Sequence, residues 1–392
     1  MAVAGAALIQ FCGFGYTNSF GVYQDYYTRI YITNASSSAI SWIGSVNAFL
    51  VIVSGLWAGI LYDRGYFYYL LYGGSILISF SLFMLSLTKP DHLWQNFLAQ
   101  GVGIGLGAGM MYVPSIAVLS QYFSRRRTLA MTIVASGSSF GAIIHPIMLN
   151  NLFASRLGFQ KSVRISAGFV SVVLFAACFL LRPRFVAGPV KKPPLHKSLR
   201  KFYSQWSFTA ISLGGFFFPV GLYFPIFYIQ LDAIKHGLSK SFAFYVLVIL
   251  NACSFIGRLA PGPFIYTIGV IRMITFASLG CSVLIFGIIG LSGVGSVIPL
   301  AILYGFFAGV FVSLQSPLVA VLTEDMSELG ARLGVAFTFC AFGSLIGPPI
   351  QGALLTDKFI WWRPALVSGL FSLVGTVAFA SILLTSKRAR AG

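Results

Sequence analysis

The chain has 392 residues and a formal net charge of +18, but only 9% of its residues are charged and 57% are hydrophobic. Soluble domains carry about 25% charged residues, so this composition excludes a soluble fold and predicts that most of the surface faces lipid. The basic residues are spread over many short segments, a distribution that argues against nucleic-acid binding.

Apolar stretches long enough to cross a membrane follow one another along the chain. A span needs about 20 apolar residues. The approximate limits of the stretches are 2–23, 40–62, 67–87, 93–121, 128–153, 162–182, 203–230, 241–263, 271–291, 297–320, 333–355 and 361–385. We therefore expect an all-α membrane protein with twelve transmembrane helices. The pairs Pro261 with Pro263 and Pro348 with Pro349 are expected to bend or break their helices.

A basic, proline-rich segment at 183–202 divides the chain into two halves. The amino-terminal half, 1–182, and the carboxy-terminal half, 203–392, each contain six of the predicted spans. We expect the segment between them to be a cytoplasmic linker and each half to form a six-helix bundle.

The two halves repeat short motifs in the same order. Pro114–Leu119 recurs as Pro317–Leu322, 203 residues later, and Gly137–Gly141 recurs as Gly343–Gly347, 206 residues later. Similar halves in an apolar chain are typical of secondary transporters, which handle their substrate between the halves. The repeat therefore predicts two pseudo-symmetric bundles.

The distribution of basic residues predicts the orientation. If both termini are cytoplasmic, the inner segments hold sixteen of the 26 Lys and Arg residues and the outer segments hold nine. Cytoplasmic loops carry such an excess. We expect an integral multi-pass protein with cytoplasmic termini, located in the plasma membrane, with the lipid bilayer as a partner. The sequence does not indicate whether an accessory protein is needed.

No pattern in the sequence is typical of an enzyme. The five Cys residues lie singly within predicted spans, which argues against a disulfide framework or a metal site. A nucleophile–base set and a phosphate-binding loop are also missing. We therefore expect no catalytic activity, no metal and no other cofactor.

The loop after the second predicted span contains a charged turn. Gly59–Gly65 reads Gly-Ile-Leu-Tyr-Asp-Arg-Gly and resembles the loop motif of the major facilitator superfamily. A carboxylate in such a turn can meet a helix N-terminus or an arginine. Asp63 and Arg64 are therefore expected to form a latch that favours one state of a transporter; the simpler alternative is an ordinary turn at the membrane surface.

Further segments resemble the monocarboxylate transporter family and its fungal branch. They are Tyr122–Ala130 and Ala135–Gly141 for the family, and Gly15–Gln24, Tyr304–Gly309, Ser313–Pro317 and Gly347–Gly352 for the fungal branch. The resemblance covers essentially the whole chain and implies the major facilitator fold and carrier activity. Arg126 and Arg127 lie in the first of these segments, and Arg332 follows Arg126 by 206 residues; we expect all three to act in gating.

Arg258 is the basic residue that we place well inside a predicted span. A guanidinium in hydrocarbon costs at least a few kcal/mol, so it must face a wet cavity or a partner. The resemblance implies that it meets a substrate carboxylate, which its planar fork can bind through two hydrogen bonds. The alternatives are a packing arginine bonded to helix carbonyls, or one near enough to the interface to reach it.

Two positions depart from the pattern of the family. Where the animal members carry an aspartate one turn before this arginine, the chain has Ser254, and where they carry a lysine in the first span it has Asn18. Neither substitute titrates near neutral pH. His145 is the candidate proton carrier in their place, because an imidazole titrates near working pH; the alternative is a hydrogen-bonded structural histidine.

Uncharged polar side chains at membrane depth are further candidates for substrate binding. They are Asn18, Asn47, Asn251 and Gln315, together with the tyrosines Tyr23, Tyr112 and Tyr304. Each must find a partner in a helix interface or a cavity, and tyrosine also anchors helices at the membrane surface.

The predicted function is transport of a small organic anion, a monocarboxylate in the first instance, by alternating access. A proton is a candidate co-substrate. A carrier of a larger or neutral solute such as a vitamin is the alternative within transport. A nutrient sensor of the same fold that does not transport is the alternative from another class.

Overall fold

The computed structural model describes residues 1–35, 37–124, 126–184, 195–235, 239–291, 294–355 and 360–391, and these residues contain helices and no strand. They form two compact units. The first consists of Met1–Lys191 with Ser327–Gly334, and the second of Lys192–Met326 with Val335–Gly392. The predicted linker at 183–202 lies partly outside the described residues, and a short helix, α11, occupies its end.

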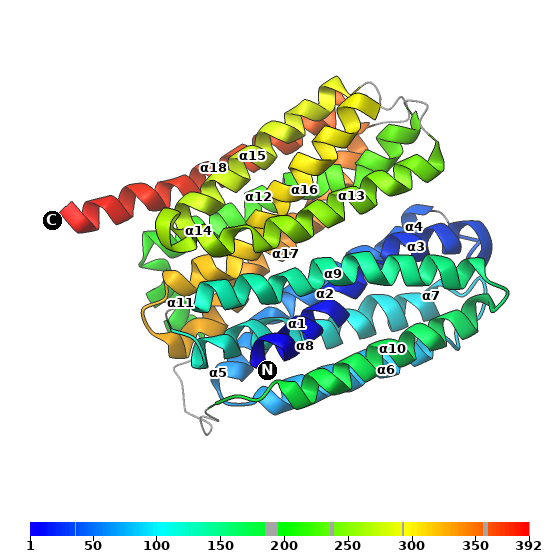
Figure 1. Ribbon diagram of the computed structural model, residues 1–392, viewed down its shortest axis with the longest axis horizontal. Coiled ribbons are helices and arrows are strands. Elements are labelled where there is room, and N and C mark those ends of the chain that lie inside the picture. Colours follow the sequence, from blue (N-terminus) through cyan, green and yellow to red (C-terminus); the bar gives the residue numbers. More distant parts are fainter. Residues whose placement is uncertain are drawn as a thin grey trace. The chain divides into compact units, whose positions relative to one another are not determined.

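The first unit is a bundle built from short and long helices (Figure 1). Its elements are α1 Ala2–Cys12, α2 Phe14–Thr17, α3 Phe20–Tyr26, η1 Tyr27–Tyr31, α4 Ser37–Val53, α5 Gly55–Asp63, α6 Phe67–Leu85, α7 Leu93–Asn96, η2 Phe97–Ile104, α8 Gly105–Ala117, η3 Val118–Gln121, α9 Arg127–Ala154 and α10 Gly158–Leu180. Helix α1 packs against α9 and α10, and α8 packs against α4, α5 and α6.

The first predicted span, 2–23, is not one continuous helix. It is interrupted at Gly13 and again at Asn18 and Ser19, and a π-helical turn follows at Tyr27–Tyr31. Glycine has a low helix propensity. The Asn18 amide donates to the Phe14 carbonyl (2.9 Å) and the Ser19 hydroxyl to the Tyr16 carbonyl (2.6 Å). Such local bonds compete with the helical pattern.

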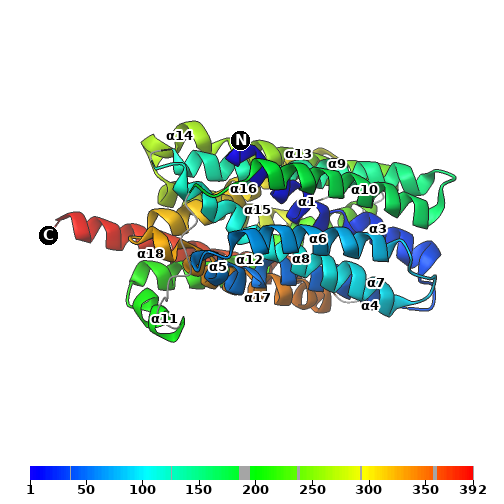
Figure 2. The same cartoon turned by 90° about the horizontal axis from the view of Figure 1, so that it is seen from below.

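The second unit consists mainly of long helices, seen from below in Figure 2. Its elements are α11 Leu195–Tyr203, α12 Trp206–Lys235, α13 Lys240–Leu259, α14 Pro261–Ile268, α15 Val270–Gly287, η4 Ile288–Gly290, α16 Val294–Val321, most of α17 Leu329–Leu355, and α18 Trp362–Ala391. The start of α17, up to Gly334, belongs to the first unit together with most of the turn η5 Met326–Glu328 before it. Helix α12 packs against α13 and α18, and α15 packs against α16 and α18.

The prolines have different effects on the two helices where bends were predicted. The chain bends by 43° between Tyr245–Leu259 and Pro261–Ile268, because a proline in a helix removes a hydrogen bond and its ring clashes with the preceding turn. Pro348 and Pro349 lie within α17, which is assigned as one helix. The predicted bend is confirmed only at Pro261.

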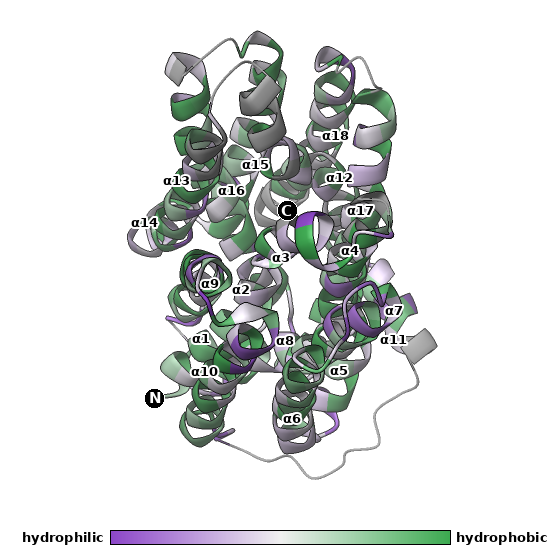
Figure 3. Cartoon of the chain, turned by 90° about the vertical axis from the view of Figure 1, so that its right-hand side faces the viewer, coloured by the Kyte–Doolittle hydropathy of each residue, from purple (hydrophilic) through white to green (hydrophobic). Residues whose placement is uncertain are grey.

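The all-α membrane class is confirmed. Ten described helices are long and apolar enough to span a membrane, and the bent pair α13–α14 brings the number to eleven. The region of the first predicted span adds short helices that fall below that length. Hydrophobic residues occur along the length of most helices (Figure 3). On α10, Val172 and Phe175 are 68% and 66% exposed, which is the expected state of side chains that face lipid.

Glycines let helices touch through their backbones in the same way in both units. A Cβ atom on Gly105 or Gly109 of α8 would collide with backbone or Cβ atoms of α4. Gly305 and Gly309 of α16, each 200 residues later, stand in the same relation to the carbonyls of α13. Small residues at such crossings are the usual basis of tight packing between membrane helices.

Candidate functional site

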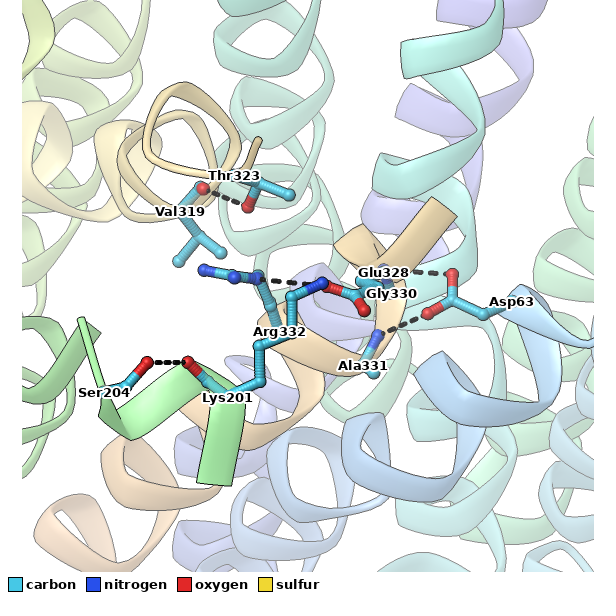
Figure 4. Close-up of polar contacts among 9 residues, drawn as sticks. All are labelled: Asp63, Lys201, Ser204, Val319, Thr323, Glu328, Gly330, Ala331 and Arg332. Carbon is cyan, nitrogen blue, oxygen red and sulfur yellow. Dashed lines mark hydrogen bonds and ion pairs between the residues drawn. The ribbon is translucent and has the colours of Figure 1, made fainter. Parts of the chain in front are cut away.

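A carboxylate caps the start of a helix in the first unit. The oxygens of Asp63, at the end of α5, accept hydrogen bonds from the N–H groups of Gly330 (3.1 Å) and Ala331 (2.8 Å) in the first turn of α17 (Figure 4). The N-terminus of a helix carries unpaired N–H groups and a partial positive charge. The geometry is that of a carboxylate meeting a helix N-terminus, one of the two partners that the loop motif predicted.

Four glycines bring α5 and the start of α17 together. A Cβ atom on Gly330 would lie 2.5 Å from the Gly59 carbonyl oxygen, and one on Gly334 would lie 2.5 Å from the Gly55 carbonyl oxygen. Gly55, Gly59 and Asp63 are spaced four residues apart, so they share one face of α5. A larger residue at Gly59, Gly330 or Gly334 would push the two helices apart and lengthen the hydrogen bonds of Asp63.

The four arginines predicted to act in gating occupy different environments. Arg332 is 2% exposed, and its Nε lies 4.0 Å from a carboxylate oxygen of Glu328. Arg64 and Arg126 are exposed, and Arg127, the first residue of α9, is half-buried. A gating role for these residues stays a prediction.

Arg258 is a buried cation in the second unit. It is 7% exposed and lies in the last turn of α13, directly before the bend at Pro261. Tyr223 of α12 interacts electrostatically with Arg258 and shares a hydrogen bond with Ser344 of α17. A cation near the C-terminus of a helix is also favoured by the helix dipole. The surroundings therefore suit either an anion-binding arginine or a structural one.

The uncharged candidates differ in how much of their side chain remains available. Asn18 is exposed at the break between α2 and α3, and the Tyr112 ring is half-buried, 5.9 Å from that of Phe14. Asn251 donates back to the Leu247 carbonyl of its own helix (3.1 Å). Gln315 is half-buried and lines a small, otherwise apolar cavity within the second unit.

Tyr23 and Tyr304 are fully buried inside their units. The Tyr23 hydroxyl lies 2.6 Å from that of Tyr16, and the Tyr304 hydroxyl donates to the Leu222 carbonyl (2.5 Å). Their polar ends are therefore used within the bundles in this structure. A contact of either residue with substrate stays a prediction.

His145 is fully buried between α1, α9 and α10. Its Nε2 lies 3.2 Å from the carbonyl oxygen of Phe11, and its ring lies 4.5 Å from that of Phe11 and 5.0 Å from that of Tyr16. A carbonyl only accepts hydrogen bonds, so Nε2 must carry the hydrogen. The role of His145 as a proton carrier stays a prediction.

Sequence reasoning missed several buried polar contacts. The Gln100 side chain accepts a hydrogen bond from the Tyr27 hydroxyl (2.8 Å), and the backbone carbonyl of Gln100 accepts one from the Asn47 side-chain amide (2.7 Å). Thr17 donates to the Asn47 side chain (2.8 Å). Gln351 of α17 was also missed. An amide at membrane depth, which must find a partner, was the signal available for both glutamines.

A sequence profile of the Major Facilitator Superfamily matches residues 4–324. The chain belongs to the major facilitator superfamily. Relatives within the superfamily match along almost its whole length. The Aspyridones efflux protein apdF of Emericella nidulans is 37% identical over 98% of the chain and 78% of its own length. The Agnestins efflux protein of Paecilomyces divaricatus is 34% identical over 96% and 85%. The Fujikurins efflux protein of Gibberella fujikuroi is 34% identical over 99% and 83%.

Solved structures of the superfamily share the fold. The E. coli fucose:proton symporter superposes with a TM-score of 0.77 at 15% identity, over 96% of this chain and 97% of that one. The human organic anion transporter MFSD10 gives a TM-score of 0.71 at 16% identity over the same shares. The family match and the transporter relatives, together with this fold, make the chain a membrane transporter of this superfamily and not an enzyme.

Proposed function

We propose that this transporter exports a small organic molecule of the secondary-metabolite type by alternating access. The identity of 37% to an efflux protein, over 98% of the chain, is the observation that carries the proposal. Two further relatives bear efflux names. We further propose that the protein works in the plasma membrane with both termini in the cytoplasm, in keeping with its excess of basic residues in the inner segments.

The substrate proposed is largely apolar and carries one acidic group. Several polar side chains in the spans are used within the units, among them Tyr23, Asn47 and Tyr304. Arg258 remains the candidate partner for the acidic group, because a buried guanidinium needs a compensating anion or polar shell. Asn18, Asn251, Gln315 and Tyr112 are the candidates for contacts with the rest of the solute.

Transport of simple monocarboxylates is the second candidate. It is supported by Arg258 and by the resemblance of Tyr122–Ala130 to the monocarboxylate transporter family. This version needs a proton carrier other than Asn18 and Ser254, since neither titrates near neutral pH. The sequence offers His145, and the pH profile of a His145→Gln variant tests that role.

Asp63 is proposed to act as the latch of the transport cycle. In the present state it holds the start of α17 through two hydrogen bonds. Breaking them would free that helix end and permit the opposite state, and Arg64, Arg126, Arg127 and Arg332 would adjust the balance between the states. Hydrogen bonds to charged groups contribute about 1.5–3 kcal/mol each, enough to shift such an equilibrium strongly.

Uptake into proteoliposomes tests the proposal. Labelled lactate and pyruvate would be compared with larger apolar carboxylic acids, with and without an imposed proton gradient. Saturable transport of the larger acids and none of lactate supports metabolite export, whereas the reverse result supports the monocarboxylate version. Absence of both transport and counterflow would favour a sensor and contradict the proposal.

A further inference from the structure

One face of α9 packs directly against the backbone of α1, the first helix of the first predicted span. A Cβ atom on Gly137 would overlap the carbonyl oxygen of Ala7, and one on Gly141 would overlap that of Phe11. One turn later on the same face, His145 donates its Nε2–H to the Phe11 carbonyl (3.2 Å). A glycine and a side-chain donor thus converge on one carbonyl of α1.

The same arrangement occurs in the second unit between α17 and α12. A Cβ atom on Gly343 would overlap the carbonyl oxygen of Phe216, and one on Gly347 would lie 2.5 Å from that of Val220. One turn later, the Gln351 amide donates to the Val220 carbonyl (2.6 Å).

The two arrangements correspond residue by residue. Gly343, Gly347 and Gln351 each follow Gly137, Gly141 and His145 by 206 residues, and the two carbonyl partners, Phe216 and Val220, each follow Ala7 and Phe11 by 209 residues. A constant offset on each side of the contact indicates that both are copies of one contact, inherited when the halves duplicated.

The chemistry of the two side chains also corresponds. Each donates a hydrogen bond from an Nε2 atom, and each keeps one buried acceptor, Nδ1 of His145 and Oε1 of Gln351, for which the described part of the chain offers no hydrogen-bond partner. Both side chains are buried, with at most 1% exposed. In this bond the imidazole does nothing that an amide cannot do.

Both carbonyls lie where their span is weakened. Phe11 lies one residue before the end of α1 and two before the break at Gly13. Val220 lies between Pro219 and Pro225 of α12, which lack the N–H groups that would bond to the nearby carbonyls of Gly215 and Gly221. A proline or glycine leaves helix backbone groups without their usual partners, which neighbouring helices must then satisfy within a membrane.

We propose that His145 and Gln351 are two copies of one positioning device. His145 holds the Phe11 carbonyl near the interruption of the first span, and Gln351 holds the Val220 carbonyl between the prolines of α12. Helix α1 then moves together with α9, and α12 moves together with α17, during transport. His145 thus acts as a neutral hydrogen-bond donor and not as the proton carrier. The inference rests on transport by this superfamily fold but not on the substrate proposed above.

Exchange of the two residues tests the device. We expect His145→Gln and Gln351→His to keep transport within about twofold and to keep the pH profile of the unaltered protein, because each side chain presents its donor at a similar reach. His145→Leu and Gln351→Leu remove the donor. We expect them to lower the maximal rate about tenfold at unchanged KM, since a buried carbonyl then loses its bond.

The outcomes separate the device from a proton carrier. A His145→Gln variant that loses its pH dependence, or its transport, would overturn the inference, as would leucine variants with the unaltered rate. If the leucine variants do not insert, the thermal stability of the exchange variants decides: Tm values close to that of the unaltered protein support the device, and a large drop contradicts it. The substrate panel of the unaltered protein tests the proposed function separately.

Discussion

The two units hold their helices by the same backbone contacts but differ in their polar side chains. In both units, glycines of one helix contact backbone carbonyls of a neighbouring helix at corresponding positions: those of α9 contact α1, and those of α17 contact α12. The first unit adds an uncharged network of Tyr27, Gln100, Asn47 and Thr17, whereas the second contains the buried Arg258. The contacts made by the helix backbones are thus similar in the two halves, whereas the polar side chains differ.

The spans that carry the paired carbonyls show the same contrast. Span one is divided into α1, α2 and α3, whereas its counterpart α12 runs from Trp206 to Lys235 as one helix with two prolines inside. Glycine and asparagine end a helix, but proline within a membrane helix bends it without ending it when neighbouring groups satisfy the freed carbonyl. The corresponding spans of the two halves are therefore interrupted in one case and carry internal prolines in the other.

The largest effect is expected where a shared backbone contact is broken. Gly141→Val places a branched side chain against the Phe11 carbonyl, and overpacking of this kind costs about 1–3 kcal/mol or more. We expect most of the protein to be lost from the folded fraction in detergent, measured by size-exclusion chromatography. Gly168→Val on α10 is the matched control, because nothing lies within 4 Å of its added Cβ. Equal losses for both variants would contradict the role of the contact.

The Asp63 contact is expected to give the next largest effect. Asp63→Ala removes two hydrogen bonds to a helix N-terminus, each contributing about 1.5–3 kcal/mol, and we expect transport in proteoliposomes to fall at least tenfold. Asp63→Asn keeps one acceptor oxygen, so its transport rate should lie between those of Asp63→Ala and the unaltered protein. Glu324→Gln, which alters an exposed carboxylate of the second unit, serves as control. Full transport by Asp63→Ala would remove the latch from the cycle.

The next prediction concerns Arg258, the buried cation of the second unit, and tests whether it recognises an acidic group of the solute. If it pairs with an acidic group, Arg258→Gln should raise KM for acidic solutes by about one to two powers of ten and leave the KM of their neutral amides unchanged. Uptake of matched acid and amide pairs measures this. Arg272→Gln, at an exposed position of α15, is the control. An equal loss for acid and amide would indicate a structural arginine.

The smallest effect is expected in the uncharged network of the first unit. Tyr27 and Asn47 both bond to Gln100, so Tyr27→Phe and Asn47→Ala should each lower stability by about 1 kcal/mol. Their combination should deviate from additivity by about 0.5 kcal/mol or more. Thermal unfolding of the single and double variants gives this coupling. Strict additivity would mean that the bonds act separately.

The features that could be predicted from the sequence are those that depend on a single helix. Hydropathy located the spans, and the repeat of Gly137–Gly141 as Gly343–Gly347 marked corresponding positions in the two halves. Asp63 was predicted to meet a helix N-terminus or an arginine, but that the helix is α17 follows only from the structure. Likewise His145 was noticed for its pKa range and Gln351 was not noticed at all, because their equivalence depends on which carbonyl each side chain reaches across a helix interface.

The interrupted first span has a consequence for membrane insertion during synthesis. A span whose backbone is interrupted cannot satisfy itself in lipid, and the side chain that bonds to its Phe11 carbonyl, His145 on α9, lies far downstream. At synthesis rates of about 5–20 residues per second, the donor at position 145 emerges on the order of ten seconds after position 11. During that interval the Phe11 carbonyl lacks the hydrogen bond from His145, so we expect the new segment to stay within the insertion machinery. Insertion of α9 then supplies the missing hydrogen bond.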